Sequence, residues 1–222
     1  MAGRHIFQKN KSLYVQYGCG FDAPDTWINF DSSPTLRFER LPLIGKLYTK
    51  NEKRFPDNIK YGNIVSELPI KNESCDGIYC SHVLEHLALK NFRKALENTY
   101  AYLKPGGIFR LVIPDLYCYA EEYMRAFSKG KNEASMNFMK SSGLGIEEEK
   151  KGIFCFFYEV LSGSRHKWMW DYHSLNKELK AVGFLKIRKS KFNDSSDKRF
   201  GEVENKNRFE KALAMECRKP LA

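Results

Sequence analysis

The sequence has no run of about 18 apolar residues, so it predicts no transmembrane helix. Its first residues, MAGRHIFQKNKS, lack the apolar middle of a secretory signal. None of its six cysteines forms a C-x-x-C pair, and the chain is neither small nor loop-rich. Free thiols in a reducing compartment are therefore expected, and with them a cytoplasmic location.

The composition is that of one globular domain. The chain has 222 residues, of which 42% are hydrophobic and 29% charged, so residues 1–222 can form a single domain with a sizeable core. The formal net charge of +10 favours an anionic partner such as nucleic acid, a nucleotide-bearing substrate or a membrane surface. The alternative is that lysines simply keep the protein in solution, and the sequence leaves both open.

Apolar runs and helical periodicity alternate along the chain. Strands are predicted within residues 12–20, 26–31, 59–65, 75–81, 108–115, 184–192 and 212–219. Helices are predicted within residues 82–103, 116–127 and 171–184. This alternation predicts an α/β fold whose sheet is mostly parallel, with an antiparallel edge where the last two strands follow each other directly. Residues 32–58 look like an irregular insertion with a short helix near residues 42–48, and residues 128–170 like a second insertion.

A glycine turn and an acid follow the first two predicted strands. Gly18 and Gly20 would let the backbone approach a ligand closely, and Asp31 can accept hydrogen bonds from both hydroxyls of a ribose. Together they suggest a cofactor that contains adenosine. The full G-x-G-x-x-G pattern is absent, and only ten residues separate Gly20 from Asp31. That connection is too short for the helix that binds a pyrophosphate, which argues against NAD.

Five segments occur in an order that resembles a known family. They are YVQYGCG, WINFD, SELPIKNESCDGIYCSHVLEHL, LKPGGIFRLVIPD and HKWMWDYHSLNKELKAVGF. The chain resembles class I S-adenosylmethionine-dependent methyltransferases over about residues 12–219, and most closely the small ones found with polysaccharide-biosynthesis enzymes. The resemblance implies a Rossmann-like seven-stranded methyltransferase sheet, with S-adenosyl-L-methionine as the cofactor and S-adenosyl-L-homocysteine as its product.

The resemblance also implies a role for each cofactor-side residue. The loop under the methionine part would be Gly18, Cys19 and Gly20; the ribose would be held by Asp31; the adenine would lie near Ser32, Asn63 and Ile64; the sulfonium end would lie beside Ser81 and His82. Two positions depart from the family. Gln16 stands where many relatives carry an acid, and Asn63 where an aspartate is common.

The stretch CSHVLEHL contains the pattern H-x-x-E-H of one class of zinc peptidases, formed by His82, Glu85 and His86. A zinc peptidase also needs a third ligand and a substrate groove, and nothing later in the sequence points to either. The family resemblance explains HVLEH at the start of a helix without a metal, so no metal is expected. Glu85 and His86 would then pack and cap the helix start, while His82 is the better functional candidate.

Three residues are candidates for the base that removes a proton from a methyl acceptor: His82, Asp115 and His166. His166 stands among basic and aromatic residues, Arg165–Trp170, that could hold an anionic acceptor bearing a sugar. Alternatively these tryptophans belong to the core and the charges to its rim. Asp115 could be a base or a metal ligand, or it could simply cap the next helix.

Three functions follow from these observations. The first is O-methylation of a sugar hydroxyl, in a glycan or a nucleotide sugar. The second is methylation of RNA or protein by the same fold, which rests mainly on the charge of +10. An N/D-P-P-Y motif for amino methylation is missing after the fourth strand, where CSHV stands instead. The third is a non-catalytic binding protein, which Gln16 and Asn63 leave open. The oligomeric state is not predicted.

Overall fold

The computed structural model describes residues 12–42, 54–147 and 165–221. Seven strands form one sheet in the order β3-β2-β1-β4-β5-β7-β6. The strands are β1 (Tyr14–Tyr17), β2 (Ile28–Asp31), β3 (Ile59–Tyr61), β4 (Cys75–Ser81), β5 (Leu103–Pro114), β6 (Leu185–Lys189) and β7 (Ala212–Arg218). Neighbours among β1–β5 are parallel, and β7 is antiparallel to both β5 and β6. The predicted seven-stranded α/β sheet is confirmed.

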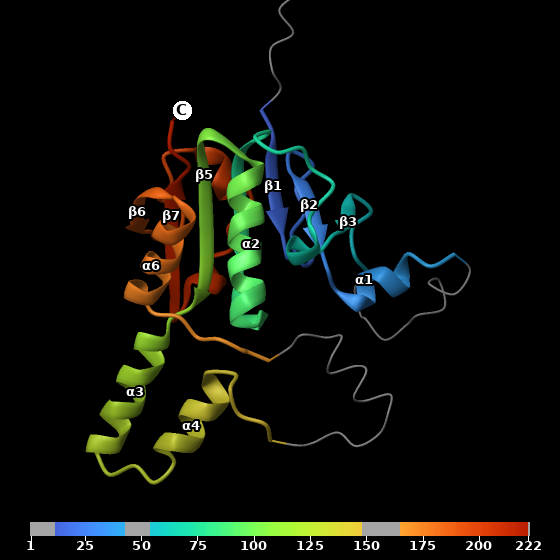
Figure 1. Cartoon of the computed structure of the whole chain (residues 1–222). Helices are drawn as coiled ribbons and strands as arrows, with labels where there is room; N and C mark the ends of the chain where they lie inside the picture. The colour runs from blue at the N-terminus through green and yellow to red at the C-terminus, as the bar shows by residue number, and fades with distance from the viewer. Residues whose placement is uncertain (1–11, 43–53, 148–164, 222) are drawn as a thin grey trace, which may run out of the picture.

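Helices cover one face of the sheet and extend beyond its carboxyl edge. They are α1 (Pro34–Glu39), α2 (Leu89–Tyr102), α3 (Leu116–Ser128), α4 (Ala134–Ser141) and α6 (Tyr172–Val182). Short 3₁₀ turns are η2 (Ile64–Ser66), η3 (Leu84–His86), η4 (Lys198–Glu202) and η5 (Lys206–Phe209). In Figure 1, α2 and α6 lie against the sheet, and α3 and α4 extend below it. Within the described ranges, no helix has the length and apolar character that crossing a bilayer requires.

Strand β5 shows why the sheet is buried on both faces. Phe109 and Leu111 point into the core formed with α2 and α6, whereas Ile108 and Val112 point into a second core on the opposite face. This second core includes Phe200, from the segment that joins β6 to β7. The alternation has the period of two expected of a strand. The long apolar run of β5 therefore supports both layers.

Several boundaries differ from those predicted. Of the helix predicted near residues 42–48, all but residue 42 lies outside the described residues; the helix found in this insertion is α1, capped by Ser33. The helix predicted from residue 82 begins only at Leu89, after η3. The KPGG segment does end that helix, but it already belongs to β5, because Leu103 pairs with Cys75. The second insertion contains the end of α3 and all of α4, and residues 148–164 lie outside the described ranges.

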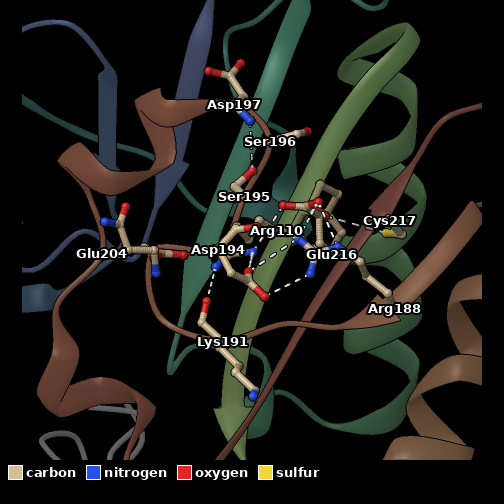
Figure 2. A network of polar contacts seen from close by, with 12 residues as sticks. Arg110, Arg188, Lys191, Asp194, Ser195, Ser196, Asp197, Glu204, Glu216 and Cys217 are labelled. Atoms are coloured by element: carbon tan, nitrogen blue, oxygen red, sulfur yellow. Dashed lines mark hydrogen bonds and ion pairs between the residues drawn. The ribbon is translucent and has the colours of Figure 1, made fainter.

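A buried arginine fixes the segment between β6 and β7 to the sheet. The side chain of Arg110 is 0% exposed and pairs with the carboxylates of Glu204, Asp194 and Glu216. A second arginine, Arg188, also binds Asp194 and Glu216, as Figure 2 shows. Burial alone would lower the pKa of Arg110, but its hydrogen bond to Glu204 and the surrounding carboxylates raise it. The guanidinium therefore stays charged and holds three separate segments together.

Replacing Arg110 is expected to destabilise the fold strongly. Arg110→Met leaves buried carboxylates without a counter-charge, which costs about 3–5 kcal/mol when one partner of a buried pair is removed. Urea unfolding followed by circular dichroism measures this loss. Arg93→Met is the matched control, because Arg93 pairs with Glu178 at the surface, and a much smaller loss is expected there. Equal losses in the two variants would contradict the structural role of the Arg110 network.

Candidate functional site

The turn after β1 lies at the carboxyl edge of the sheet. Gly18 and Gly20 both have positive φ, +69° and +57°, a conformation that glycine adopts without strain. A Cβ at Gly18 would lie 2.0 Å from Cγ2 of Val83, so no larger residue fits there. The backbone N–H of Cys19 donates to the carbonyl of Phe30 at 3.2 Å, which ties the turn to β2. The backbone of the turn is therefore held at the carboxyl edge of the sheet, where a ligand can approach it closely.

Asp31 ends β2 beside this turn and is 8% exposed. Its Oδ2 accepts the N–H of Gly20 at 3.0 Å, and its Oδ1 accepts the N–H of Ser33 at 2.7 Å. Each carboxylate oxygen has a second lone pair, so the group can still accept from two hydroxyls of a ligand. The neighbouring Ser32 is exposed. This arrangement fits a ribose diol.

The end of β3 lies next to Asp31. The N–H of Gly62 donates to the Asp31 carbonyl at 3.0 Å, which brings Asn63 and Ile64 to the same edge. Asn63 caps η2 by accepting the N–H of Val65 at 2.9 Å, and Ile64 is buried. Part of the hydrogen-bonding capacity of the Asn63 amide is thus used within the chain.

Gln16 does not project freely into this edge. Its side chain is buried, and its amide donates to the carbonyl of Asp22 at 2.6 Å and to Oδ1 of Asn29 at 2.7 Å. Gln16 therefore holds the chain that follows the glycine turn. The departure from the family at this position has a structural use.

Ser81 is the last residue of β4, and His82 follows it. Ser81 is buried, and its Oγ has no hydrogen-bond partner in the described ranges. His82 has a positive φ of +53°; its Nε2 donates to the carbonyl of Arg208 at 2.8 Å, and its Nδ1 lies 3.4 Å from Oε1 of Glu85. Burial would lower the pKa of His82, but the interactions with Glu85 and the Arg208 carbonyl raise it. Both ring nitrogens are thus engaged within the chain.

Arg208, in η5, is a site residue that sequence reasoning missed. Its Nη1 donates to the carbonyl of Ser81 at 3.4 Å, and its Nη2 would lie 3.7 Å from a Cβ at Gly20. The guanidinium therefore stands between the glycine turn and the end of β4, where it can attract an anionic group. The sequence shows Arg208 only as one charge in a polar loop, and nothing local marks it.

The other two base candidates have structural partners. Asp115 caps α3 by accepting the N–H of Tyr117 at 3.0 Å, as its structural alternative predicted. His166 is 17% exposed; its Nδ1 donates to the carbonyl of Ser142 at 2.6 Å, and its Nε2 lies 4.0 Å from Oε1 of Glu85. The structure thus brings His82 and His166 to the same carboxylate. Glu85, which the sequence analysis expected only to pack and cap the helix start, therefore lies where two of the base candidates meet.

The tryptophans near His166 divide between core and surface. Trp170 is 2% exposed and stacks on Phe92, with 4.2 Å between ring centroids. Trp168 is 42% exposed. The core interpretation is therefore confirmed for Trp170, whereas a role of Trp168 in binding an acceptor stays a prediction.

Comparison with known proteins identifies the family. The model of a family described as "Methyltransferase domain" matches residues 13–188. A comparison with curated protein sequences finds no match.

Several solved structures have a similar chain path. One is a SAM-dependent methyltransferase from Archaeoglobus fulgidus, which has 15% sequence identity and a TM-score of 0.48. The alignment covers 94% of this chain and 86% of that one. A methyltransferase in complex with the Haloferax volcanii Trm112 activator has 14% identity, a TM-score of 0.47 and coverage of 95% and 83%. Phosphoethanolamine N-methyltransferase 2 of Haemonchus contortus, in complex with S-adenosyl-L-methionine, has 11% identity, a TM-score of 0.47 and coverage of 94% and 49%. Similarities at this level do not identify the acceptor.

The family match spans most of the chain. The glycine turn, Asp31 at the end of β2 and the strand order all agree with it. The predicted cofactor, S-adenosyl-L-methionine, is therefore confirmed. The chain belongs to the methyltransferase-domain family and is an S-adenosylmethionine-dependent methyltransferase.

Proposed function

We propose that the cofactor lies across the carboxyl ends of β1, β2 and β4. The assigned contacts are Gly18, Cys19 and Gly20 with the methionine part, Asp31 with the ribose, Ser32, Asn63 and Ile64 with the adenine, and Ser81 and His82 with the sulfonium end. Arg208 is added to this set as the partner of the methionine carboxylate. The support for this addition is its position, because its guanidinium contacts Ser81 and stands over Gly20. The Oγ of Ser81, which has no hydrogen-bond partner among the described residues, is a polar atom that a ligand can satisfy.

Arg208→Met is expected to weaken binding of S-adenosylhomocysteine by about 10- to 100-fold, since a hydrogen bond to a charged group contributes roughly 1.5–3 kcal/mol. Binding of 5′-methylthioadenosine, which lacks the carboxylate, should change by less than about twofold, because the lost interaction is absent there. Isothermal titration calorimetry with both ligands measures the difference.

Arg199→Met is the control for this experiment, because it removes the same charge from the same segment. Arg199 lies over the ring of Tyr14, with 4.2 Å to the ring centroid, and pairs with Asp197. Neither ligand should lose affinity in this variant. If Arg208→Met weakened both ligands equally, the assignment of the carboxylate would be wrong.

We propose that the acceptor is a hydroxyl oxygen of a sugar, in a glycan or a nucleotide sugar. The observation that carries this proposal is the exposed indole of Trp168, whose backbone contacts Glu85. The N–H groups of Lys167 and Trp168 both donate to the carbonyl of Glu85, at 2.7 and 3.1 Å. This fixes the backbone that bears the indole next to the end of β4. An exposed aromatic ring on a fixed backbone can pack against the apolar face of a sugar ring.

The chemistry is an in-line displacement. The acceptor oxygen forms a bond to the methyl carbon, the bond between that carbon and sulfur breaks, and the hydroxyl proton leaves the oxygen. The protein aligns the acceptor oxygen with the methyl group of the sulfonium and accepts the proton that the hydroxyl releases. Because the nitrogens of His82 and His166 face Glu85 or backbone carbonyls, we assign the handling of this proton to the group of imidazoles around Glu85 as a whole.

Trp168→Ala is expected to raise KM for the sugar acceptor roughly 2- to 12-fold, because an aromatic stacking contact contributes about 0.5–1.5 kcal/mol. Affinity for S-adenosylhomocysteine should be unchanged, and Trp168→Phe should keep most of the acceptor affinity. The measurement is transfer of labelled methyl from S-adenosylmethionine to a panel of monosaccharides, nucleotide sugars and oligosaccharides.

Leu221→Ala is the surface control, since Leu221 is 80% exposed near the carboxyl terminus of the chain. Methylation of RNA or protein in the same assay, with no transfer to any sugar, would overturn the sugar proposal. Saturable cofactor binding without transfer to any acceptor class would favour a non-catalytic protein instead.

A further inference from the structure

A buried carboxylate without a hydrogen-bond partner among the described residues lies close to the end of β4. Glu85, in η3, is 0% exposed, and neither of its carboxylate oxygens accepts a hydrogen bond in the part of the chain that the structure describes. A buried carboxylate in this condition is costly unless it takes up a proton or pairs with a cation. The surroundings of Glu85 show which cation fits.

Imidazole rings surround this carboxylate. The nearest nitrogens to its Oε1 are Nδ1 of His82 at 3.4 Å, Nε2 of His86 at 3.8 Å and Nε2 of His166 at 4.0 Å. One ligand atom from each of Glu85, His86 and His166 lies within 4.8 Å of the other two. A tetrahedral ion with bonds of about 2.0–2.1 Å holds its ligands roughly 3.4 Å apart. Shifts of roughly 1 Å in these side chains would therefore complete such a site.

The tautomers of two of these rings suit a metal. Nδ1 of His86 bonds to the carbonyl of Arg165 at 2.9 Å, and Nδ1 of His166 bonds to the carbonyl of Ser142 at 2.6 Å. A carbonyl only accepts, so Nδ1 carries the proton, and Nε2 of each neutral ring turns a lone pair toward Glu85. A backbone carbonyl behind each ring is the outer-shell arrangement that orients metal-binding histidines. Without a cation between them, these lone pairs would face a negative carboxylate.

The chain is built so that His166 reaches Glu85. Gly143 has a φ of +70°, and a Cβ there would lie only 2.8 Å from Nδ1 of His166, so the absence of a side chain makes room for the ring. The hydrogen bonds from Lys167 and Trp168 to the Glu85 carbonyl fix the segment that carries His166. His86 and His166 are 26% and 17% exposed, which leaves their side of the cluster open to solvent.

We propose that Glu85, His86 and His166 bind one divalent transition-metal ion, with Zn²⁺ the ion that suits two imidazoles and a carboxylate best. Magnesium and calcium prefer oxygen ligands only, so they fit this set poorly. The H-x-x-E-H segment thus supplies two ligands, and the third, which the sequence did not reveal, comes from His166. The site does not make the protein a peptidase. Its position next to His82 suits it to bind an acceptor hydroxyl and lower that hydroxyl's pKa; with His86 and His166 bound to the ion, His82 is the imidazole of the cluster left to take the proton. That consequence rests on the proposed function, whereas metal binding does not.

The test is titration of Zn²⁺ into the full chain, without an affinity tag and after treatment with a chelator, followed by calorimetry. We expect one ion per chain, and at least about tenfold weaker binding in both Glu85→Gln and His166→Asn. With Co²⁺ as the probe, the absorption spectrum should lack the intense sulfur-to-cobalt band that cysteine ligands would produce. No cofactor or acceptor is present, so failure of this test is distinct from failure of the methyl-transfer proposal.

His173→Asn is the matched control, because His173 is an exposed histidine of α6 outside the cluster; binding should be unchanged. Thermal unfolding of each variant shows that it is folded, and Glu85→Gln keeps the shape of the side chain in case His166→Asn does not fold. The proposal is overturned if wild-type protein binds no stoichiometric ion, which would mean that a protonated histidine neutralises Glu85. It is equally overturned if both variants bind as wild type does.

Discussion

The arrangement of the site depends on the buried charge network of Arg110. One face of the sheet is covered by α2 and α6, but the other is crossed by the segment between β6 and β7, whose only helical pieces in the described structure are the short turns η4 and η5. Such turns bury little apolar surface. Phe200 and Val203 anchor this segment by apolar contacts, and Glu204 and Asp194, bound to Arg110, anchor it by charge.

A buried ion network fixes the relative position of the segments it joins, in addition to stabilising the fold. Its desolvation cost offsets much of the Coulomb attraction, so apolar side chains of the same volume could stabilise the fold as well. Apolar contacts, however, tolerate small shifts of one segment along another. The guanidinium of Arg110 meets three carboxylates in fixed directions, and Glu204 stands four residues before Arg208. The network therefore fixes where Arg208 stands at the carboxyl edge.

The sequence predicted what is encoded locally. The apolar strand within residues 108–115, the helix within residues 171–184, and the placement of Gly20 and Asp31 at one edge all depend on residues close in the chain or on strand order. Contacts between distant segments were not predictable. Arg208 lies 126 residues from His82 in the sequence. The ring of His166 has room beside Glu85 because Gly143 has no side chain. The fifth strand was predicted to begin too late, at residue 108, for the same reason, since Leu103 is placed in β5 by its pairing with Cys75 of β4.

His82 joins the two halves of the site. A non-glycine residue with positive φ is held there at a cost of about 1–3 kcal/mol, so other contacts must fix it. Its N–H donates to the Val112 carbonyl at 2.9 Å, its Nε2 binds the carbonyl of the residue expected to meet the cofactor carboxylate, and its Nδ1 faces Glu85. Removing its ring would therefore disturb the cofactor side and the Glu85 cluster at once. Loss of activity in such a variant would not show that His82 is the base, and the separate substitutions at Arg208 and Glu85 divide the two effects because each touches one side of the ring.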